Sequence, residues 1–427
     1  MLAWVLGATV SSEIFYAGFR FVNLFRSVIG EGAFNAVYMP TRGERWEAAD
    51  FVKGVLAVVT LFSIALLIIL WLSNGQLWGR LFPELVVRAR SAGLDISALA
   101  WVIPIPSLML ISAFFMAELN FNGRHYVAAI SSVVPNLSVL VATIGCVLVV
   151  EEATASIALN ALTLGYVVLL MVVATSSRKV VCSAVRDGVI RRLMVASFSK
   201  AALPILLAGV LFQANIFIGV IFASRFDGGV TYVYYSERLW QLPVLIFTPA
   251  ISSVYIRKVS VLVGSGDFKR AAMIQGIALM CVVVTCFPLS LFLFFESKAV
   301  VSLLFERGEF SESDVELVAS ILRISSWCII GAIFLRILNA VHFATGRRGT
   351  VLTVNAVGLA INLLVLAITV SDYKLLAVPF GLLASYGIQV LLSTVLQLRV
   401  GSLHLSVKTI SGLCLAGGMG LISVGLH

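Results

Sequence analysis

Residues 51–73 read FVKGVLAVVTLFSIALLIILWLS, and this stretch decides the solvent in which the chain folds. It holds a single charged residue, Lys53, in a run that exceeds the ~20 apolar residues a helix needs to cross the ~30 Å hydrocarbon layer of a bilayer. Inside hydrocarbon, backbone N–H and C=O groups must find partners within the segment, so such a run folds as an α-helix. The stretch therefore predicts a transmembrane helix.

The rest of the chain has the same character. Of its 427 residues, 60% are hydrophobic and 12% are charged, and its mean hydropathy is +1.05, whereas soluble domains carry about 25% charged residues. We predict an all-α polytopic membrane protein with twelve spans, preceded by a stub of a first helix at residues 1–10. The predicted spans are residues 13–40, 51–73, 96–119, 126–150, 154–176, 199–224, 228–256, 271–296, 315–344, 350–371, 375–398 and 407–426.

Lysine and arginine residues gather in alternate loops, and this bias predicts the orientation of the helices. Cytoplasmic loops of membrane proteins are enriched in Lys and Arg, so we expect the loop after residue 40 and the basic stretch 177–198 in the cytoplasm. The acidic stretch 309–316 falls on the opposite side. Topology thus accounts for the net charge of +9, and we expect no nucleic acid partner.

The basic stretch also predicts how the chain is divided. We expect an N-terminal lobe at residues 1–176, a cytoplasmic linker at 177–198, a C-terminal lobe at 199–398 and an additional helix at 407–427. Counting the stub, each lobe has six helices. Both lobes then begin on the same side, which predicts two pseudo-symmetric lobes related by an axis along the membrane normal.

Span 13–40 carries charge where charge is costly. An arginine at the bilayer centre costs roughly 2.5–3.5 kcal/mol on the insertion scale. At 100° per residue, Arg20, Asn23 and Arg26 fall on one arc of the helix, with the two arginines about 9 Å apart along its axis. Glycines on both sides of Glu31 would loosen the helix there. We expect this arc to face a wet cavity walled by protein.

Span 228–256 carries a second polar group. Tyr234, Arg238 and Gln241 are spaced i, i+4, i+7, and Glu237 lies on a neighbouring face, from which it could pair with an arginine. Guanidinium groups stay charged and bind phosphates through bidentate hydrogen bonds. A cationic central cavity between the two lobes would therefore suit an anionic head group better than a cationic drug.

Each of these charges also has a structural interpretation. A charged side chain can form an ion pair within the helix bundle or extend to an interface. We favour this interpretation for Glu118, Arg323 and Arg336, and the binding interpretation for Arg20, Arg26 and Arg238, which occupy the second helix of each half.

Three segments resemble the MurJ/MviN family. Residues 19–34, FRFVNLFRSVIGEGAF, are similar to its second-helix signature, residues 234–239, YYSERL, to a segment of its second lobe, and residues 304–310, LFERGEF, to one of its loops. The three occur in the family's order and spacing. Val22 departs from the pattern, since the family usually has proline there, and the family's first-helix arginine cluster and its last helix have no counterpart, as though the chain were truncated at both ends.

The resemblance implies a fold and a function. The fold would be that of the MOP superfamily, which includes MATE transporters. The function would be alternating-access transport of lipid II, the undecaprenyl-pyrophosphate-linked peptidoglycan precursor, across the bacterial inner membrane. Arg26 and Arg238 would take the places of arginines needed for transport, and Glu13 that of a usual acidic residue. Partners would be lipid II or a related polyprenyl-pyrophosphate sugar, membrane lipid and the peptidoglycan synthesis machinery. Some family members bind sodium through acidic residues on later helices. We find no matching acidic residue near Asn355 or Asn362, so sodium coupling is not expected.

Other functions stay open at this point. A relative could transport other polysaccharide lipids, and a degenerate or truncated copy would be a membrane protein that transports nothing. An enzyme is disfavoured, because we find no phosphate-binding loop, nucleophile motif or paired carboxylates. Six dispersed cysteines without a C-x-x-C motif lead us to expect neither a metal nor a cofactor.

Overall fold

The structure is a computed structural model that describes residues 7–26, 29, 33–44, 48–94, 96–131, 133–149, 155–190 and 192–399. These residues form α-helices and two short 3₁₀ helices, and they include no strand. The predicted helix at 407–427, and residues 1–6 of the predicted stub, lie outside this part of the chain. The contacts between residues divide the chain into two units, Met1–Gln213 and Ala214–His427.

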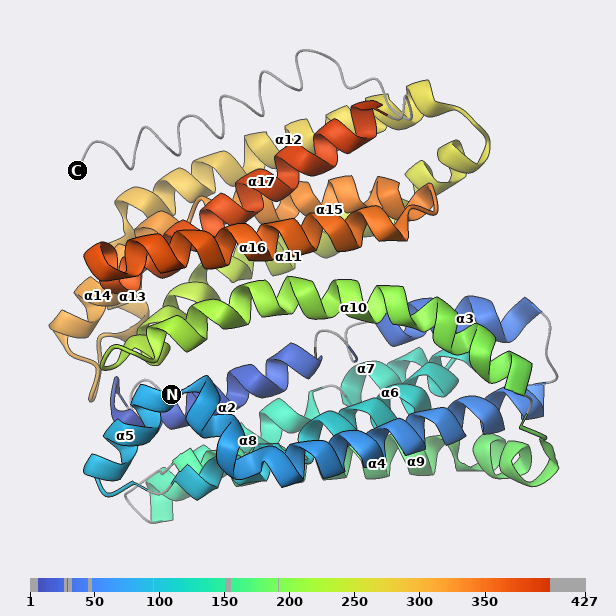
Figure 1. Cartoon of the computed structure of the whole chain (residues 1–427), viewed down its shortest axis with the longest axis horizontal. Helices are drawn as coiled ribbons and strands as arrows, with labels where there is room; N and C mark the ends of the chain where they lie inside the picture. The colour runs from blue at the N-terminus through green and yellow to red at the C-terminus, as the bar shows by residue number, and fades with distance from the viewer. Residues whose placement is uncertain are drawn as a thin grey trace. The chain divides into compact units, whose positions relative to one another are not determined.

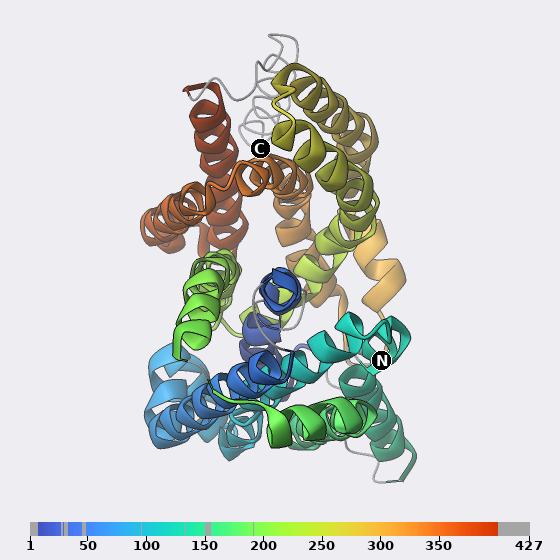
Figure 2. The ribbon, with the colours of Figure 1, turned by 90° about the vertical axis from the view of Figure 1, so that its right-hand side faces the viewer.

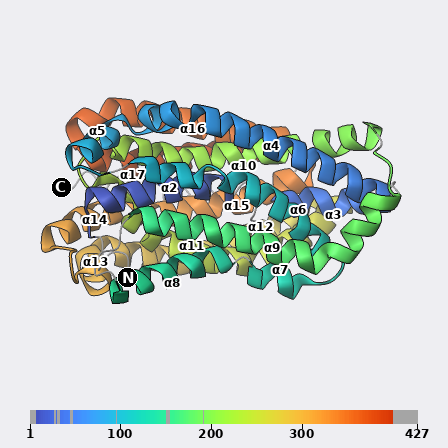
Figure 3. The same ribbon diagram turned by 90° about the horizontal axis from the view of Figure 1, so that it is seen from below.

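The first unit is built around two long helices, α4 and α9. Helix α4 packs against α9 along the lower edge of Figure 1, and Figure 3 shows both helices from below. Its elements are α2 (Val10–Phe25), α3 (Ala33–Glu44), α4 (Ala48–Leu81), α5 (Pro83–Ser91), η2 (Ile96–Val102), α6 (Ile105–Phe121), α7 (His125–Ser131), α8 (Val134–Val149), α9 (Ala155–Asp187) and the first part of α10 (Arg192–Ala223).

The second unit begins within α10. Its helices α16 and α17 form an extensively packed pair, drawn in orange and red in Figures 1 and 2. Helices α11 and α15 pack against each other and against α12 and α14. The elements of the unit after α10 are α11 (Gly229–Gly264), α12 (Phe268–Phe295), α13 (Ser297–Phe305), α14 (Glu312–Ser325), α15 (Cys328–Ala344), α16 (Arg348–Tyr373), η3 (Lys374–Leu376) and α17 (Ala377–Arg399).

Seven helical segments of the described chain are long and apolar enough to cross a membrane, and two of them contain two α-helices each. Large apolar side chains on α4 point outward, with Leu72 80% and Trp71 61% exposed, as expected where lipid is the solvent. The seven segments are Ala48–Leu81, Ile96–Phe121, Ala155–Asp187, Leu206–Ala223, Phe268–Phe295, Glu312–Ala344 and Gly349–Leu398.

Several predicted spans contain two described helices each. Span 13–40 contains α2, which ends at Phe25, and α3, which begins at Ala33. Spans 126–150 and 315–344 are also two helices each. The apolar pattern locates a buried segment but does not register a short break within it.

The predicted linker at 177–198 is largely helical. The end of α9 and the start of α10 cover most of it. Between them, the Val189 N–H donates to Asp50 Oδ1 at 2.6 Å, and a Cβ on Gly188 would lie 2.4 Å from the Ala49 carbonyl oxygen. This connection therefore lies directly on the start of α4. The division between the units falls inside α10, and the lobe bounds 1–176 and 199–398 stay a prediction.

Candidate functional site

Helix α2 holds the first group of predicted site residues. Thr9 caps the helix by accepting from the Ser12 N–H at 3.4 Å. Arg20 is 7% exposed and lies in the body of the helix. Asn23 and Arg26 are half-buried, and Arg26 is the C-cap residue that follows the end of α2 at Phe25. The structure thus places the three polar residues on the last turns of one helix. Glu31 lies outside the described residues.

The N-terminal end of α2 is fixed by an ion pair. The Glu13 carboxylate is fully buried, and its Oε2 accepts from Arg88 Nη2 of α5 at 2.8 Å. A buried carboxylate without a cation would be costly, so Arg88 satisfies a charge that α2 carries into the unit. The pair stabilises the orientation of the helix on which Arg20 and Arg26 lie.

Helix α11 holds the second group, and its side chains contact one another. The Arg238 guanidinium lies 4.8 Å from the centre of the Tyr234 ring, within the range of a cation–π interaction. Gln241 donates from Nε2 to Glu237 Oε1 one turn further on. Glu237 is only 4% exposed. The structure therefore brings the four predicted residues together as two pairs, each with i, i+4 spacing.

Glu237 also lines a small pocket within the second unit. The polar walls of this pocket come from Asn215 of α10, Asn362 of α16 and Ser325 of α14, and the remainder is mostly apolar. Asn362 Nδ2 donates to the Asn215 backbone oxygen at 2.7 Å and to its Oδ1 at 2.8 Å. The pocket thus joins the polar face of α11 to a buried amide cluster.

The rest of this amide cluster was missed by sequence reasoning. Ser385 of α17 donates to the Gly358 carbonyl oxygen at 2.8 Å, and Gln389 Nε2 donates to Ser385 Oγ at 2.8 Å. The signal was available, because each of these residues interrupts a long apolar run. Its members carry no charge, however, and an uncharged polar residue in a membrane helix is a weaker sign of a functional site than an arginine is.

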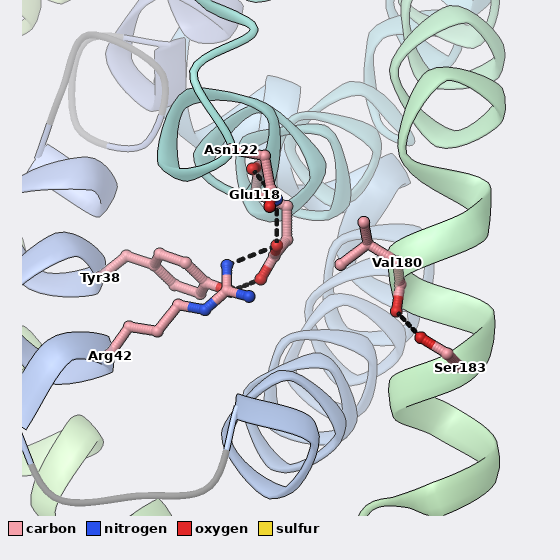
Figure 4. Close-up of polar contacts among 6 residues, drawn as sticks. All are labelled: Tyr38, Arg42, Glu118, Asn122, Val180 and Ser183. Carbon is pink, nitrogen blue, oxygen red and sulfur yellow. Dashed lines mark hydrogen bonds and ion pairs between the residues drawn. The ribbon is translucent and has the colours of Figure 1, made fainter.

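Glu118 belongs to a separate network, which Figure 4 shows. It is fully buried at the end of α6 and accepts from Arg42 Nη1 of α3 at 2.5 Å, from the Tyr38 hydroxyl and from Asn122 Nδ2 at 3.1 Å. The Arg42 guanidinium also lies 3.9 Å from the centre of the Phe121 ring. The structural interpretation of Glu118 as a bundle ion pair is confirmed.

The second and third sequence motifs contact each other. The ring of Tyr235 lies with its centre 4.7 Å from that of Phe305 and 5.5 Å from that of Phe310. Residues 304–310 therefore pack on α11, one helical turn before Arg238. The two site groups, on α2 and on α11, belong to different units, and their meeting in one cavity stays a prediction.

Comparison with solved structures shows which fold the chain has. The fold is similar to that of the lipid II flippase MurJ in an inward closed conformation, with a TM-score of 0.76, 18% identity and coverage of 99% of this chain and 87% of that chain. It is also similar to an inward-facing MATE family multidrug transporter, with a TM-score of 0.74, 14% identity and coverage of 92% and 90%. The predicted all-α, MOP-type transporter fold is confirmed.

Sequence comparison gives the family. The family model described as lipid II flippase MurJ matches residues 2–416. A probable lipid II flippase MurJ of Aquifex aeolicus (strain VF5) is 26% identical over 355 residues, which cover 80% of this chain and 67% of the relative. A protein of the same name from Rhizobium tropici is 26% identical over 379 residues, covering 85% and 70%. The chain belongs to the MurJ family.

The family and the structure together fix the location. A MurJ family member with seven membrane-length helical segments among its described residues is a multi-pass protein of the bacterial inner membrane. The family is one of transporters and not of enzymes. The resemblance that the three sequence motifs carried is confirmed.

Proposed function

We propose that this chain moves lipid II from the inner to the outer leaflet of the bacterial inner membrane by alternating access. The observation that carries the proposal is the match of the MurJ family model to nearly the whole chain, residues 2–416. The transport is vectorial, and it breaks no bond. Lipid II is the substrate, and contact with the peptidoglycan synthesis machinery belongs to the same proposal.

The residues proposed to bind the head group come from both units. Arginine suits this substrate because its planar guanidinium forms paired hydrogen bonds with phosphate and stays charged at any physiological pH. Arg26 and Arg238 are assigned to the pyrophosphate. The polar side chains beside them are assigned to the remainder of the head group. These are Arg20, Asn23 and Glu31 in the first unit and Tyr234, Glu237 and Gln241 in the second.

The arrangement of α11 supports the role of Arg238. The guanidinium lies over the electron-rich face of the Tyr234 ring. A cation–π contact is worth about 0.5–2 kcal/mol and involves the face of the cation's partner ring, so it holds the guanidinium at a defined place on α11. The Glu237–Gln241 pair beside it can orient hydroxyl groups of a sugar.

The test replaces single arginines. Arg26→Ala and Arg238→Ala are each expected to reduce lipid II movement in reconstituted vesicles by more than about tenfold, because each removes a charge-assisted contact worth about 1.5–3 kcal/mol. Both should fail to support growth of a strain depleted of its own flippase. The measurements are leaflet-resolved lipid II labelling and complementation, with membrane abundance determined for each variant.

Arg323→Ala is the matched control. Arg323 is an exposed arginine on α14 that is not assigned to the head group, so its removal changes the net charge equally. The control should transport at the wild-type rate. Wild-type transport by both Arg26→Ala and Arg238→Ala would contradict the proposal. Transport of a different polyprenyl-linked sugar in preference to lipid II would contradict the assigned substrate.

A further inference from the structure

A carboxylate on α14 connects to the beginning of α11. Tyr232 donates from its hydroxyl to Asp314 Oδ1 at 2.7 Å, and both residues are buried. The other oxygen of Asp314 accepts from the Ser311 N–H at 2.8 Å and from the Ser311 hydroxyl at 2.7 Å, which completes a capping box on α14. Asp314 therefore joins the cap of one helix to the side of another.

Aromatic packing holds the same part of α11. Tyr235 follows Tyr232 by three residues, so the two rings lie on one side of the helix. Tyr235 packs on Phe305 and Phe310, while the ring of Tyr232 covers Gly228, where a Cβ would lie 2.6 Å from Tyr232 Cε2. Gly228 has φ +68°, a conformation in which glycine is favoured, so the chain can enter α11 beneath the ring.

These contacts fix the rotation of α11 about its axis. Arg238 follows Tyr232 by six residues, about 9 Å along the helix, with no break between them in α11. A helix turns by about 100° per residue, so the direction of Arg238 is set once Tyr232 is fixed. Any rotation that breaks the Tyr232–Asp314 hydrogen bond turns Arg238 and Glu237 by the same angle.

We infer that Asp314 and Tyr232 are positioning residues for the head-group site. They act through α11, by holding Tyr234, Glu237 and Arg238 in the direction from which they bind substrate, and they do not touch the substrate themselves. The inference rests on the proposed function. It gives residues 304–314 a role in transport, through the helix on which they pack.

The experiment separates the hydrogen bond to α11 from the cap of α14. Tyr232→Phe removes only the hydroxyl that reaches Asp314 and keeps the ring over Gly228. Ser311→Ala removes the cap of α14 and keeps the bond to α11. Asp314→Asn keeps an oxygen for the Tyr232 hydroxyl, but its amide nitrogen cannot accept from the Ser311 N–H.

Lipid II movement is measured in reconstituted vesicles at several lipid II concentrations, together with the melting temperature of each purified variant. Tyr232→Phe is expected to raise the half-saturating lipid II concentration about 3- to 10-fold, the range that one buried hydrogen bond of this kind supplies. Ser311→Ala should lower the melting temperature at least as much as Tyr232→Phe does, and it should leave the half-saturating lipid II concentration unchanged. Asp314→Asn should behave like Ser311→Ala.

An Arg238→Ala arm distinguishes the two ways of failing. If Arg238→Ala loses transport while Tyr232→Phe matches Ser311→Ala in half-saturating concentration, the positioning role is overturned and the proposed function stands. If Arg238→Ala transports normally, Arg238 does not bind the head group and the positioning role is overturned. If Arg26→Ala also transports normally, the proposed function is overturned as well. A higher half-saturating concentration in Tyr232→Phe, and not in Asp314→Asn, supports the inference.

Discussion

Glu118 illustrates how a single buried charge determines its neighbours. Its carboxylate has no exposure and receives hydrogen bonds from Tyr38, Arg42 and Asn122. Burying two charges costs several kcal/mol per ion, and their attraction offsets this cost only when the geometry is good. The pair therefore adds little net stability, but it makes each partner intolerant of losing the other.

Removing only the carboxylate should be strongly destabilising. Glu118→Ala leaves the Arg42 guanidinium buried without its counter-charge, and we expect a loss of about 3–5 kcal/mol in the free energy of unfolding. The measurement is the unfolding of the purified protein in detergent. The double variant Arg42→Leu, Glu118→Leu should recover part of the loss, because it removes the unpaired Arg42 charge, whereas the buried Tyr38 hydroxyl still lacks its acceptor. Equal losses in the single and double variants would contradict this explanation.

At the scale of helices, α8 and α9 approach each other through a glycine. A Cβ on Gly165 would lie 2.7 Å from the Pro135 Cα and 2.2 Å from Ser138 Oγ. Ser138 Oγ also donates to the Ala161 carbonyl oxygen of α9 at 2.7 Å. Lipid tails are as apolar as the side chains of membrane helices, so the hydrophobic effect does not drive these helices together. They associate through close packing instead, which small residues allow.

Gly165→Ala should separate this pair of helices. The nearest carbon belongs to the backbone of α8, which cannot move aside without shifting the helix, and we expect a loss of about 1–3 kcal/mol in the free energy of unfolding. Gly145→Ala on α8 is the control, because a Cβ there has nothing within 4 Å. The control should be neutral or slightly stabilising. Comparable melting temperatures in the two variants would show that the close approach contributes nothing.

The sequence allowed the helices to be predicted better than their breaks. Runs of apolar residues predicted helices at 51–73 and 271–296, which the structure shows as parts of α4 and α12. The break between α14 and α15 was missed, because residues 326–327 are a serine and a tryptophan, which carry no strong signal. Hydrophobic patterning reports the solvent around a segment, whereas a short break depends on how neighbouring helices pack.

At the scale of the whole molecule, the placement of lysine and arginine predicts the orientation of every helix. Cys182 is exposed near the end of α9, in the basic stretch expected in the cytoplasm, and Ser313 is exposed on α14, in the acidic stretch expected outside. In spheroplasts, a membrane-impermeant maleimide should label a variant with Ser313→Cys as its only cysteine. A variant whose only cysteine is Cys182 should be labelled after permeabilisation alone. The opposite pattern would reverse the topology.

Sequence reasoning went further for the family than for the site. Motifs around Arg26 and Arg238 identified the family, because they combine rare charged residues at fixed spacing. Helical periodicity is local, so the sequence also predicted that Tyr234, Glu237, Arg238 and Gln241 share one helix. The hydrogen bond from α11 to Asp314 could not be predicted, because contact between α11 and α14 depends on the tertiary fold.

The buried amide cluster of α10, α16 and α17 bears on how this half of the chain is assembled during synthesis. Asn215, Asn362 and Ser385 find hydrogen-bond partners on one another's helices. A helix inserted alone would expose these groups to lipid tails, where an unsatisfied polar group costs several kcal/mol. Helix α17 is the last of the three to be synthesised. We therefore expect α10 and α16 to remain near the translocon, where their polar groups stay partly hydrated, until α17 has been inserted. Insertion of the second unit should therefore be cooperative rather than helix by helix.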